Sequence, residues 1–357
     1  MLQLTDKYSN LIKNTTEGNK ILEYLERDER VKDLIGKKNN GTFINEINMT
    51  TFAMWHLWCI NEYGQQSANK FLENYLNSDE IDVYQVLWII GILSNEPIVL
   101  KDGYSISSIE DIVNELSYDK VFKETSSNFC TTASIINSGI VKKHRIKKVL
   151  SSDEMPNGLN VEIYNREIEI AILLNSIEGI SCLPYMTIPY IKLTTFPGIF
   201  HGVVCNHSFN DVIGYSNSMI NENQVSMINM VLNAYDKLNP NKKDRINNVL
   251  NRLAKAKRQE HLEDKILDLG IALEMMLLDD NDDNTQLSLS FRLRGAWLLS
   301  RIGQNKKESY DILKDIYKFR SQVAHTGILC GGDNSKIGKL KDSFSKYQAI
   351  TEDIWRV

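Results

Sequence analysis

Residues 316–327 of this 357-residue chain read Ile316-Tyr-Lys-Phe-Arg320-Ser-Gln-Val-Ala-His325-Thr-Gly, and this stretch decides how the C-terminal part of the chain folds. Apolar side chains recur through it at helical spacing, at Leu313, Ile316, Tyr317 and Val323. Upstream, Asn305 and Glu308 have the spacing of a capping box, and the final glycine suits the left-handed conformation that ends a helix. The pattern therefore predicts a helix over residues 305–327, with Arg320 and His325 near its end.

Four further helical patterns flank this one, at residues 242–259, 262–278, 288–302 and 336–355. In the third of them the residues expected in the core are Leu293, Ala296, Trp297 and Leu299. The acidic, asparagine-rich residues 279–284 are expected to be a solvated connection. Because short connections between helices favour an antiparallel bundle, residues 241–357 are predicted to form an all-α domain.

The pairing of Arg320 with His325 indicates phosphodiester chemistry. An arginine fork binds phosphate oxygens in a fixed geometry, and a histidine moves protons near neutral pH. The sequence carries no metal-ligand cluster beside the pair, no P-loop and no G-x-S-x-G motif, so no metal or cofactor is expected. The nucleophile must then come from the substrate. The 2′-hydroxyl of RNA supplies one, and its attack leaves a 2′,3′-cyclic phosphate. Ser321 would add a hydrogen bond.

Three strings in register carry a resemblance to a known family. They are Asp268-Leu-Gly-Ile-Ala-Leu-Glu274-Met-Met-Leu-Leu-Asp, Leu289-Ser-Phe-Arg-Leu-Arg294-Gly-Ala-Trp-Leu-Leu and the segment ending at His325. Together they resemble the Apea-like branch of the HEPN superfamily. The resemblance implies a small dimerising helical bundle, an RNase of bacterial defence or toxin systems, Arg320 and His325 as its motif, and Glu274 and Arg294 as supporting polar residues. Ser321 departs from the usual asparagine, and Gln286 stands where an acidic residue is common.

Each of these residues also has a purely structural interpretation. Arg320 suits a helix surface, and a protonated His325 complements the dipole at a helix C-terminus. Glu274 interrupts an apolar stretch, so it lies at the edge of the stripe or is buried with a partner, for which Arg294 is the natural candidate. That pair is expected to support the fold rather than catalysis.

A basic segment offers a surface for RNA. Residues 242–260 hold seven lysines and arginines against two acids, and the expected phosphate contacts are Arg245, Arg252, Lys255 and Arg258. The alternative is an ordinary solvated helix face. A second basic run, Lys142-Lys-His-Arg-Ile-Lys-Lys148, either contacts nucleic acid or flanks the edge of a strand.

Composition describes a globular protein of two domains. The chain is 42% apolar with a net charge of −5, and its five cysteines show no C-x-x-C, which suits reduced thiols in a cytoplasm. Its start lacks the features of a signal peptide. Apolar runs fall far short of the ~20 residues that span a membrane, so no membrane partner is expected.

Residues 1–240 are predicted to form a separate α+β domain, which makes the whole chain α+β. Helices are expected at residues 19–37, 42–62, 67–76, 81–93 and 223–238, and strands at 159–164, 167–174, 186–194 and 198–205. Asp102-Gly103 predicts a hairpin within residues 96–106 by the dipeptide that favours type I′ turns. His201, Cys205, His207 and Cys182 are a candidate zinc set, although buried thiols and partly buried imidazoles explain them without an ion.

Two functions stay open. The first is a metal-independent endoribonuclease whose N-terminal domain senses an invader component or restrains the nuclease. A phage-derived trigger or an antitoxin is the partner that this function would imply. A single histidine does not easily act as both base and acid, so two copies of Arg320 and His325 across the two-fold axis of a homodimer are expected. The second is a non-catalytic dimeric module in which both residues only contact RNA or a nucleotide.

Overall fold

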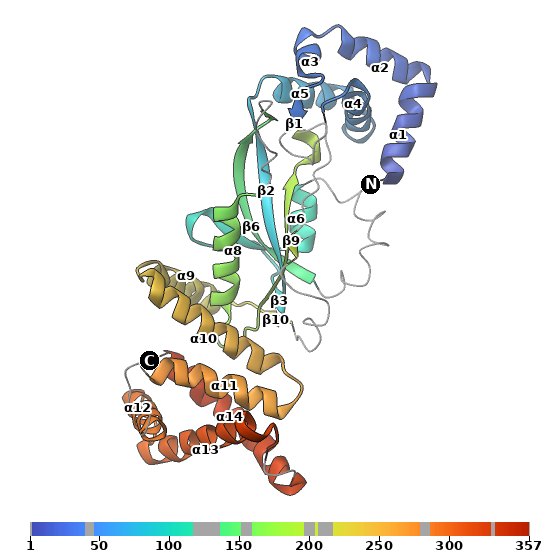
Figure 1. The fold of residues 1–357 in the computed structure, drawn as a ribbon. Helices are drawn as coiled ribbons and strands as arrows, with labels where there is room; N and C mark the ends of the chain where they lie inside the picture. The colour runs from blue at the N-terminus through green and yellow to red at the C-terminus, as the bar shows by residue number, and fades with distance from the viewer. Residues whose placement is uncertain are drawn as a thin grey trace. The chain divides into compact units, whose positions relative to one another are not determined.

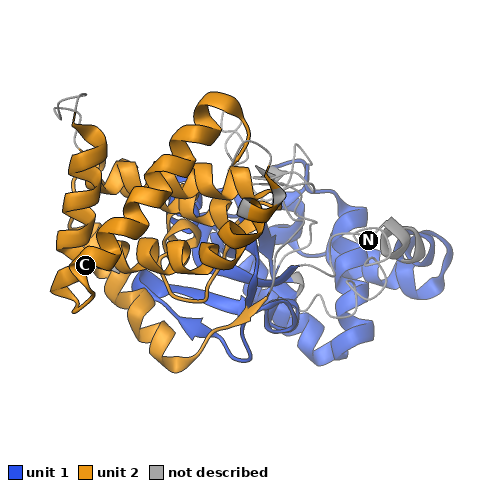
Figure 2. Cartoon of the chain, turned by 90° about the horizontal axis from the view of Figure 1, so that it is seen from below, with its two compact units in different colours: residues 1–168, 184–211 blue, residues 169–183, 212–357 orange. Residues whose placement is uncertain are grey.

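The structure is a computed structural model that describes residues 2–39, 46–116, 136–150, 159–195, 204–205, 217–278, 286–329 and 333–356. It divides into two compact units, residues 1–168 with 184–211 and residues 169–183 with 212–357 (Figure 2). The first combines helices with an antiparallel sheet, and helices dominate the second. The predicted α+β class is confirmed at this level. The second unit takes in residues 169–183 and 212–239 as well as the helices predicted from residue 241 onward.

The first unit begins with five helices. These are α1 (Leu2–Asn14), α2 (Thr16–Glu26), α3 (Glu29–Leu34), α4 (Met49–Tyr63) and α5 (Gln65–Leu76). Side chains of Thr15, Asp28 and Asn48 accept backbone N–H groups at the starts of α2, α3 and α4. The ring of Phe52 lies 5.8 Å from that of Trp55 and 5.6 Å from that of Tyr75, so aromatic packing holds α4 against α5.

A six-stranded sheet follows in the order β4-β5-β6-β2-β8-β9. Its strands are β2 (Glu80–Ile90), β4 (Ile98–Val99), β5 (Tyr104–Ser108), β6 (Ile136–Lys147), β8 (Leu183–Ile191) and β9 (Val204–Cys205). The long strands β2 and β6 run antiparallel side by side at its centre (Figure 1). Short strands β1 (Lys38–Asn39) and β7 (Val149–Leu150) pair separately. The remaining short elements are β3 (Ile92–Leu93), η1 (Lys101–Gly103) and η2 (Leu193–Thr195).

Helices cover both faces of this sheet. On one face, the amide Nε2 of Gln85 in β2 donates to the carboxyl of Glu167 in α8 (Val161–Leu174) at 3.0 Å. On the other, Ile112 of α6 (Ile109–Glu115) approaches Gly139 of β6 so closely that a Cβ there would lie 3.0 Å from its Cδ1. Gly139 therefore lets α6 lie against the sheet.

The predicted hairpin is confirmed. Strand β4 pairs with β5 in antiparallel register, Ile98 opposite Ile106. Asp102 has φ 59° and ψ 24°, and Gly103 has φ 71°, which are the positive φ values that a type I′ turn needs at its two central residues.

Three predicted segments were wrong: one predicted helix is a strand, and two predicted strands form one helix. Residues 81–93, predicted as a helix, form β2 and β3, because a strand buried on both faces has the same unbroken apolar run as a buried helix. The predicted strands at 159–164 and 167–174 are instead helix α8. There the alternating Ile163-Tyr-Asn-Arg-Glu167-Ile-Glu-Ile170 imitates a strand, while burial falls on Ile163, Glu167, Ile170 and Leu174 at helical spacing.

The second unit contains α9 (Glu222–Asp236), α10 (Pro240–Arg258), α11 (Leu262–Leu277), α12 (Leu287–Arg301), α13 (Lys306–Thr326) and α14 (Asn334–Arg356), with the short strand β10 (Ser218–Met219). Within the described ranges no helix is long and apolar enough to cross a bilayer. Helices α12 and α13 pack antiparallel: Gly295 faces Leu313, and the ring of Phe291 lies 5.2 Å from that of Tyr317. Leu293 and Trp297, expected in the core, are instead 53% and 51% exposed.

Candidate active site

Arg320 lies on α13 and pairs with Glu274 on α11. Its Nη2 donates to the Glu274 Oε2 at 2.6 Å. The two side chains are 27% and 20% exposed, so the ion pair is partly buried and solvent screens it only in part. Glu274 belongs to the 268–279 string and Arg320 to the 316–327 string, 46 residues further on. The two strings are therefore in contact through this ion pair.

Gly270 gives the Arg320 side chain its place. A Cβ built at Gly270 would lie 2.4 Å from Cγ and 2.7 Å from Cβ of Arg320, closer than real atoms approach. Gly270 and Glu274 are four residues apart and so share one side of α11. The glycine admits the aliphatic stem of the arginine, and the glutamate receives its guanidinium.

The pair leaves part of the guanidinium available. Burial raises the pKa of Glu274 above its ordinary value, and the neighbouring Arg320 opposes that rise. The Nε of Arg320 is buried, and no described atom accepts its hydrogen. A guanidinium carries five N–H donors, of which Glu274 receives one. Because the Arg320 side chain is 27% exposed, an anion such as phosphate can reach the part of the guanidinium that faces solvent.

His325 lies in the last turn of α13 and is exposed. Asn305 caps the start of this helix by accepting from Lys307 and Glu308, and Gly327 ends it with φ 69°, as predicted. In a continuous α-helix, five residues advance ~7.5 Å and leave a turn of ~140°. Arg320 and His325 of one chain therefore face different sides of α13, whereas Ser321 shares the side of His325.

The expected RNA-binding residues lie on α10, and two of them contact α11. Arg245 donates to the backbone oxygens of Met275 and Leu278, at 2.7 and 2.6 Å, at the C-terminal end of α11. Arg252 pairs with the buried carboxylate of Asp268 at 2.6 Å. Lys255 is exposed, and Arg258 donates to the backbone oxygen of Ala254. Arg245 and Arg252 thus hold the helix that carries Gly270 and Glu274.

The other predicted sites have different outcomes. Arg294 donates to the backbone oxygen of Leu277 at 2.8 Å, while Glu274 pairs with Arg320. In the basic run of residues 142–148, which lies in and just after the interior strand β6, Lys143 pairs with Asp82 and Lys148 donates to the last backbone oxygens of α5. Of the candidate zinc set, His201 and His207 lie outside the described residues. The acidic connection 279–284 does too.

Sequence reasoning missed two features of the second unit. Gly270 had a signal, because a glycine inside a strong helical pattern usually has a packing reason. The second feature is an apolar stripe on the outside of α12, made by Leu289, Leu293 and Trp297, which are 41%, 53% and 51% exposed. Its signal was the i, i+4, i+8 spacing, which places the three on one side of the helix.

Comparison with known proteins adds no relative: no family model, curated protein or solved structure matches this chain.

Proposed function

We propose that this protein is a metal-independent endoribonuclease whose active site is built from Arg320, Ser321 and His325 of α13. The observation that carries the proposal is the Arg320 side chain, which Gly270 and Glu274 hold in place while 27% of it stays exposed to solvent. A donor held in this way is suited to a phosphate oxygen. The exposed His325 five residues further on supplies the proton transfer.

The reaction needs only groups of the protein and the RNA. The 2′-oxygen attacks phosphorus as the bond to the 5′-oxygen breaks, which gives a 2′,3′-cyclic phosphate and a 5′-hydroxyl. One histidine takes the proton of the 2′-hydroxyl, and a second gives a proton to the leaving 5′-oxygen. Arg320 neutralises the charge that builds on the non-bridging phosphate oxygens, and Ser321 adds a hydrogen bond.

The separation of Arg320 and His325 around α13 favours a site shared between two copies. We propose a homodimer through the C-terminal helices, in which Arg320 and His325 of both copies meet at one phosphate. The α12 stripe is the candidate contact, because Leu and Trp on the outer side of a helix mark interfaces. Phe291 of α12 packs against Tyr317 of α13. The Leu289 end of the α12 stripe therefore lies level with the turn of α13 that carries Arg320.

The test compares two exposed histidines of the same unit. RNA cleavage by purified protein in excess EDTA should be lost in His325→Ala. It should persist in His261→Ala, whose side chain makes no capping hydrogen bond at the start of α11. Full activity in the His325 variant would refute the proposed site. Circular dichroism melts of both variants show whether the fold is intact.

A second candidate is a non-catalytic dimeric module that binds RNA or a nucleotide. The observation that favours it is the Arg320–Glu274 ion pair together with the placement of His325 on another side of α13. This module would bind RNA with an affinity that depends on Arg320, and it would leave the RNA intact at every protein concentration.

For the wider role, we propose a cytoplasmic effector of bacterial antiphage defence or of a toxin system, with the first unit responding to an invader component or an antitoxin. The resemblance of the C-terminal strings to the Apea-like HEPN branch supports this role. Growth arrest on expression of the wild-type chain, relieved by His325→Ala, is the expected result. Growth unaffected by the wild-type chain under every trigger supplied would speak against a toxin.

A further inference from the structure

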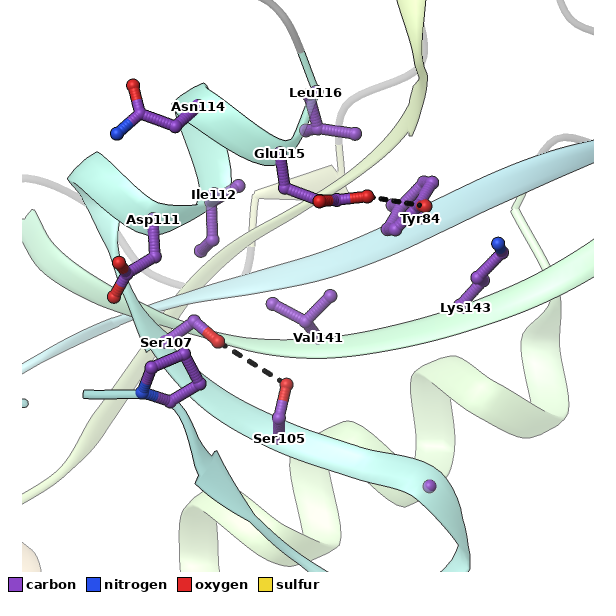
Figure 3. Close-up of a pocket in the computed structure, with 12 residues that line it drawn as sticks. Tyr84, Ser105, Ser107, Asp111, Ile112, Asn114, Glu115, Leu116, Val141 and Lys143 are labelled. Atoms are coloured by element: carbon purple, nitrogen blue, oxygen red, sulfur yellow. Dashed lines mark hydrogen bonds between the residues drawn. The ribbon is translucent and has the colours of Figure 1, made fainter. Parts of the chain in front are cut away.

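Strands β5 and β6 leave a pocket beneath α6, wholly within the first unit (Figure 3). Gly103, Ser105 and Ser107 follow one another at alternate positions and so point to the same face of the sheet. Ser105 lies opposite Val141 and Ser107 opposite Gly139, so small side chains stand where bulky ones would fill the space. The pocket has a volume of about 570 Å³. This is within the ~300–1,000 Å³ typical of small-molecule sites.

The pocket has two distinct ends. Asp111 lies on the first turn of α6, where its carboxylate accepts the hydroxyl of Ser108 at 2.6 Å, next to Ser107. Tyr84 of β2 lies opposite Lys143 of β6. Lys143 is four residues along β6 from Gly139, which is the residue opposite Ser107. Four residues of strand span ~13 Å. Figure 3 shows Asp111 at one end of the pocket and Lys143 at the other.

The charges at the Tyr84 end are already paired. The ammonium of Lys143 lies 2.7 Å from the carboxylate of Asp82, and that of Lys192 lies 3.4 Å from Glu115. The Tyr84 hydroxyl donates to Glu115 at 3.0 Å. Little charge is left at this end for a ligand to neutralise.

The Asp111 end differs. Across the part of the chain that the structure describes, the partner of the Asp111 side chain is a neutral hydroxyl, that of Ser108, and no cation pairs with it. A carboxylate offers about four acceptor sites, so further donors fit there. The hydroxyls of Ser105 and Ser107 lie 3.3 Å apart on the pocket floor, and Ile112 and Val141 line the pocket with apolar surface. Asp111 lies in the first turn of α6, and no cation among the described residues pairs with its carboxylate, so this end of the pocket disfavours anions.

We propose that this pocket binds a small organic amine. Its ammonium group pairs with Asp111 and donates to Ser107, and its apolar body lies over Val141 and Ile112 toward the ring of Tyr84. The charge complement of Asp111 selects a cation over a neutral or acidic compound of the same shape. This site is independent of the proposed nuclease chemistry, and it gives the first unit a ligand of its own.

The experiment titrates the full-length protein with three probes that share one apolar body, followed by saturation-transfer NMR. Tryptamine carries an ammonium, tryptophol a hydroxyl and indole-3-propionate a carboxylate. Tryptamine should bind saturably and at least fivefold more tightly than either of the others. Absence of saturable tryptamine binding, or equal binding of the carboxylate, would overturn the proposal.

Variants locate the site. Asp111→Asn keeps an acceptor for the Ser108 hydroxyl and should weaken tryptamine binding at least fivefold. Ser105→Leu should fill the pocket and abolish binding. The matched control is Glu110→Gln, an exposed acid on the preceding residue of the same helix that does not line the pocket. If Asp111→Asn binds tryptamine as well as Glu110→Gln does, the ammonium does not pair with Asp111. Thermal melts confirm that each variant is folded. The comparison of the three probes on the wild-type chain does not depend on the variants.

Discussion

Glu167 is a fully buried carboxyl in the first unit, 0% exposed, and its Oε1 has no partner among the described atoms. Burial raises the pKa of Glu167 to about 8, and the hydrogen bond from Gln85 lowers it in part. The folded state therefore keeps a proton that the unfolded chain releases at an ordinary pKa near 4.5. Stability is highest below that value and declines as the pH rises toward 8.

Glu167→Gln should remove this decline. The amide can still accept from Gln85 and has no charge to bury, so the free energy of unfolding should lose a pH dependence of roughly 2–5 kcal/mol. Urea unfolding at pH 5, 7 and 9 measures it, with Glu162→Gln on the exposed first turn of α8 as the control. Parallel pH profiles for wild type and Glu167→Gln would mean that Glu167 is already ionised in the folded protein.

Arg320→Lys tests whether the guanidinium fork itself is required. A lysine keeps a charge near Glu274 but presents a compact ammonium in place of a planar fork, so cleavage should fall by roughly 10² or more. The control is Arg27→Lys, whose side chain is 81% exposed in the first unit. Initial rates on a labelled RNA measure both. A lysine variant that cuts as fast as wild type would assign Arg320 a purely electrostatic role.

Single residues of the site were predictable to different degrees. Arg320 and His325 stand out in the sequence because arginine and histidine are the two residue types that the chemistry needs. The partner of Glu274 was not predictable, since Arg294 and Arg320 both follow it in the chain and only the packing of α11 against α13 decides between them. The same holds for Arg245 and Arg252, which look like phosphate ligands in sequence yet hold α11 in the fold.

At the scale of elements, the close contact of α11 with α13 depends on one glycine. Gly270→Ala would place a methyl group 2.4 Å from Cγ of Arg320, so either the side chain or the helix must shift. Such overpacking costs about 1–3 kcal/mol, and the cleavage rate should fall because Arg320 moves.

Gly338→Ala on α14 is the matched control, because nothing lies within 4 Å of its built Cβ. An alanine in an open helical position stabilises by about 0.5–1 kcal/mol. Guanidinium unfolding of the two variants should therefore shift in opposite directions. Two shifts of the same sign would show that the helix contact at Gly270 is looser than the structure has it.

Boundaries of elements were predicted well where a local rule applies. Asn305 begins α13, Gly327 ends it, and Asp102-Gly103 forms the turn between β4 and β5. At residues 81–93 a strand was predicted as a helix, because a fully buried apolar run such as Val86–Ile90 carries no periodicity. At α8 a helix was predicted as strands, because its apolar and polar residues alternate. The α6 pocket had no sequence signal either. Small residues on alternate positions of β5 become a pocket only when α6 packs over them.

For the whole molecule, the central expectation is a dimer through α12. Leu293→Glu together with Trp297→Glu should convert the dimer to a monomer in sedimentation velocity, because two charges would be buried without partners. Met230→Glu is the control, since Met230 on α9 is equally apolar and 71% exposed. A dimer that survives the double change must use another surface.

The shared active site makes a further prediction about mixed chains. A heterodimer of the wild-type chain with His325→Ala keeps only one of the two histidines that the reaction needs. Mixing wild-type protein with an excess of His325→Ala under conditions of exchange should therefore depress cleavage per wild-type chain. Cleavage that instead tracks the number of wild-type chains while heterodimers form would place a complete site on one chain.

The chemistry of the cut ends tests the nuclease assignment most directly. Purified protein is incubated with an RNA in excess EDTA, and the products are compared with those from the same RNA carrying a single 2′-deoxy nucleotide at the cut position. Attack by the 2′-hydroxyl predicts 2′,3′-cyclic phosphate and 5′-hydroxyl ends, and no cut at the deoxy position. Cleavage that requires a divalent metal ion and leaves 5′-phosphates, or that proceeds through the deoxy nucleotide, would contradict the assignment of Arg320 and His325.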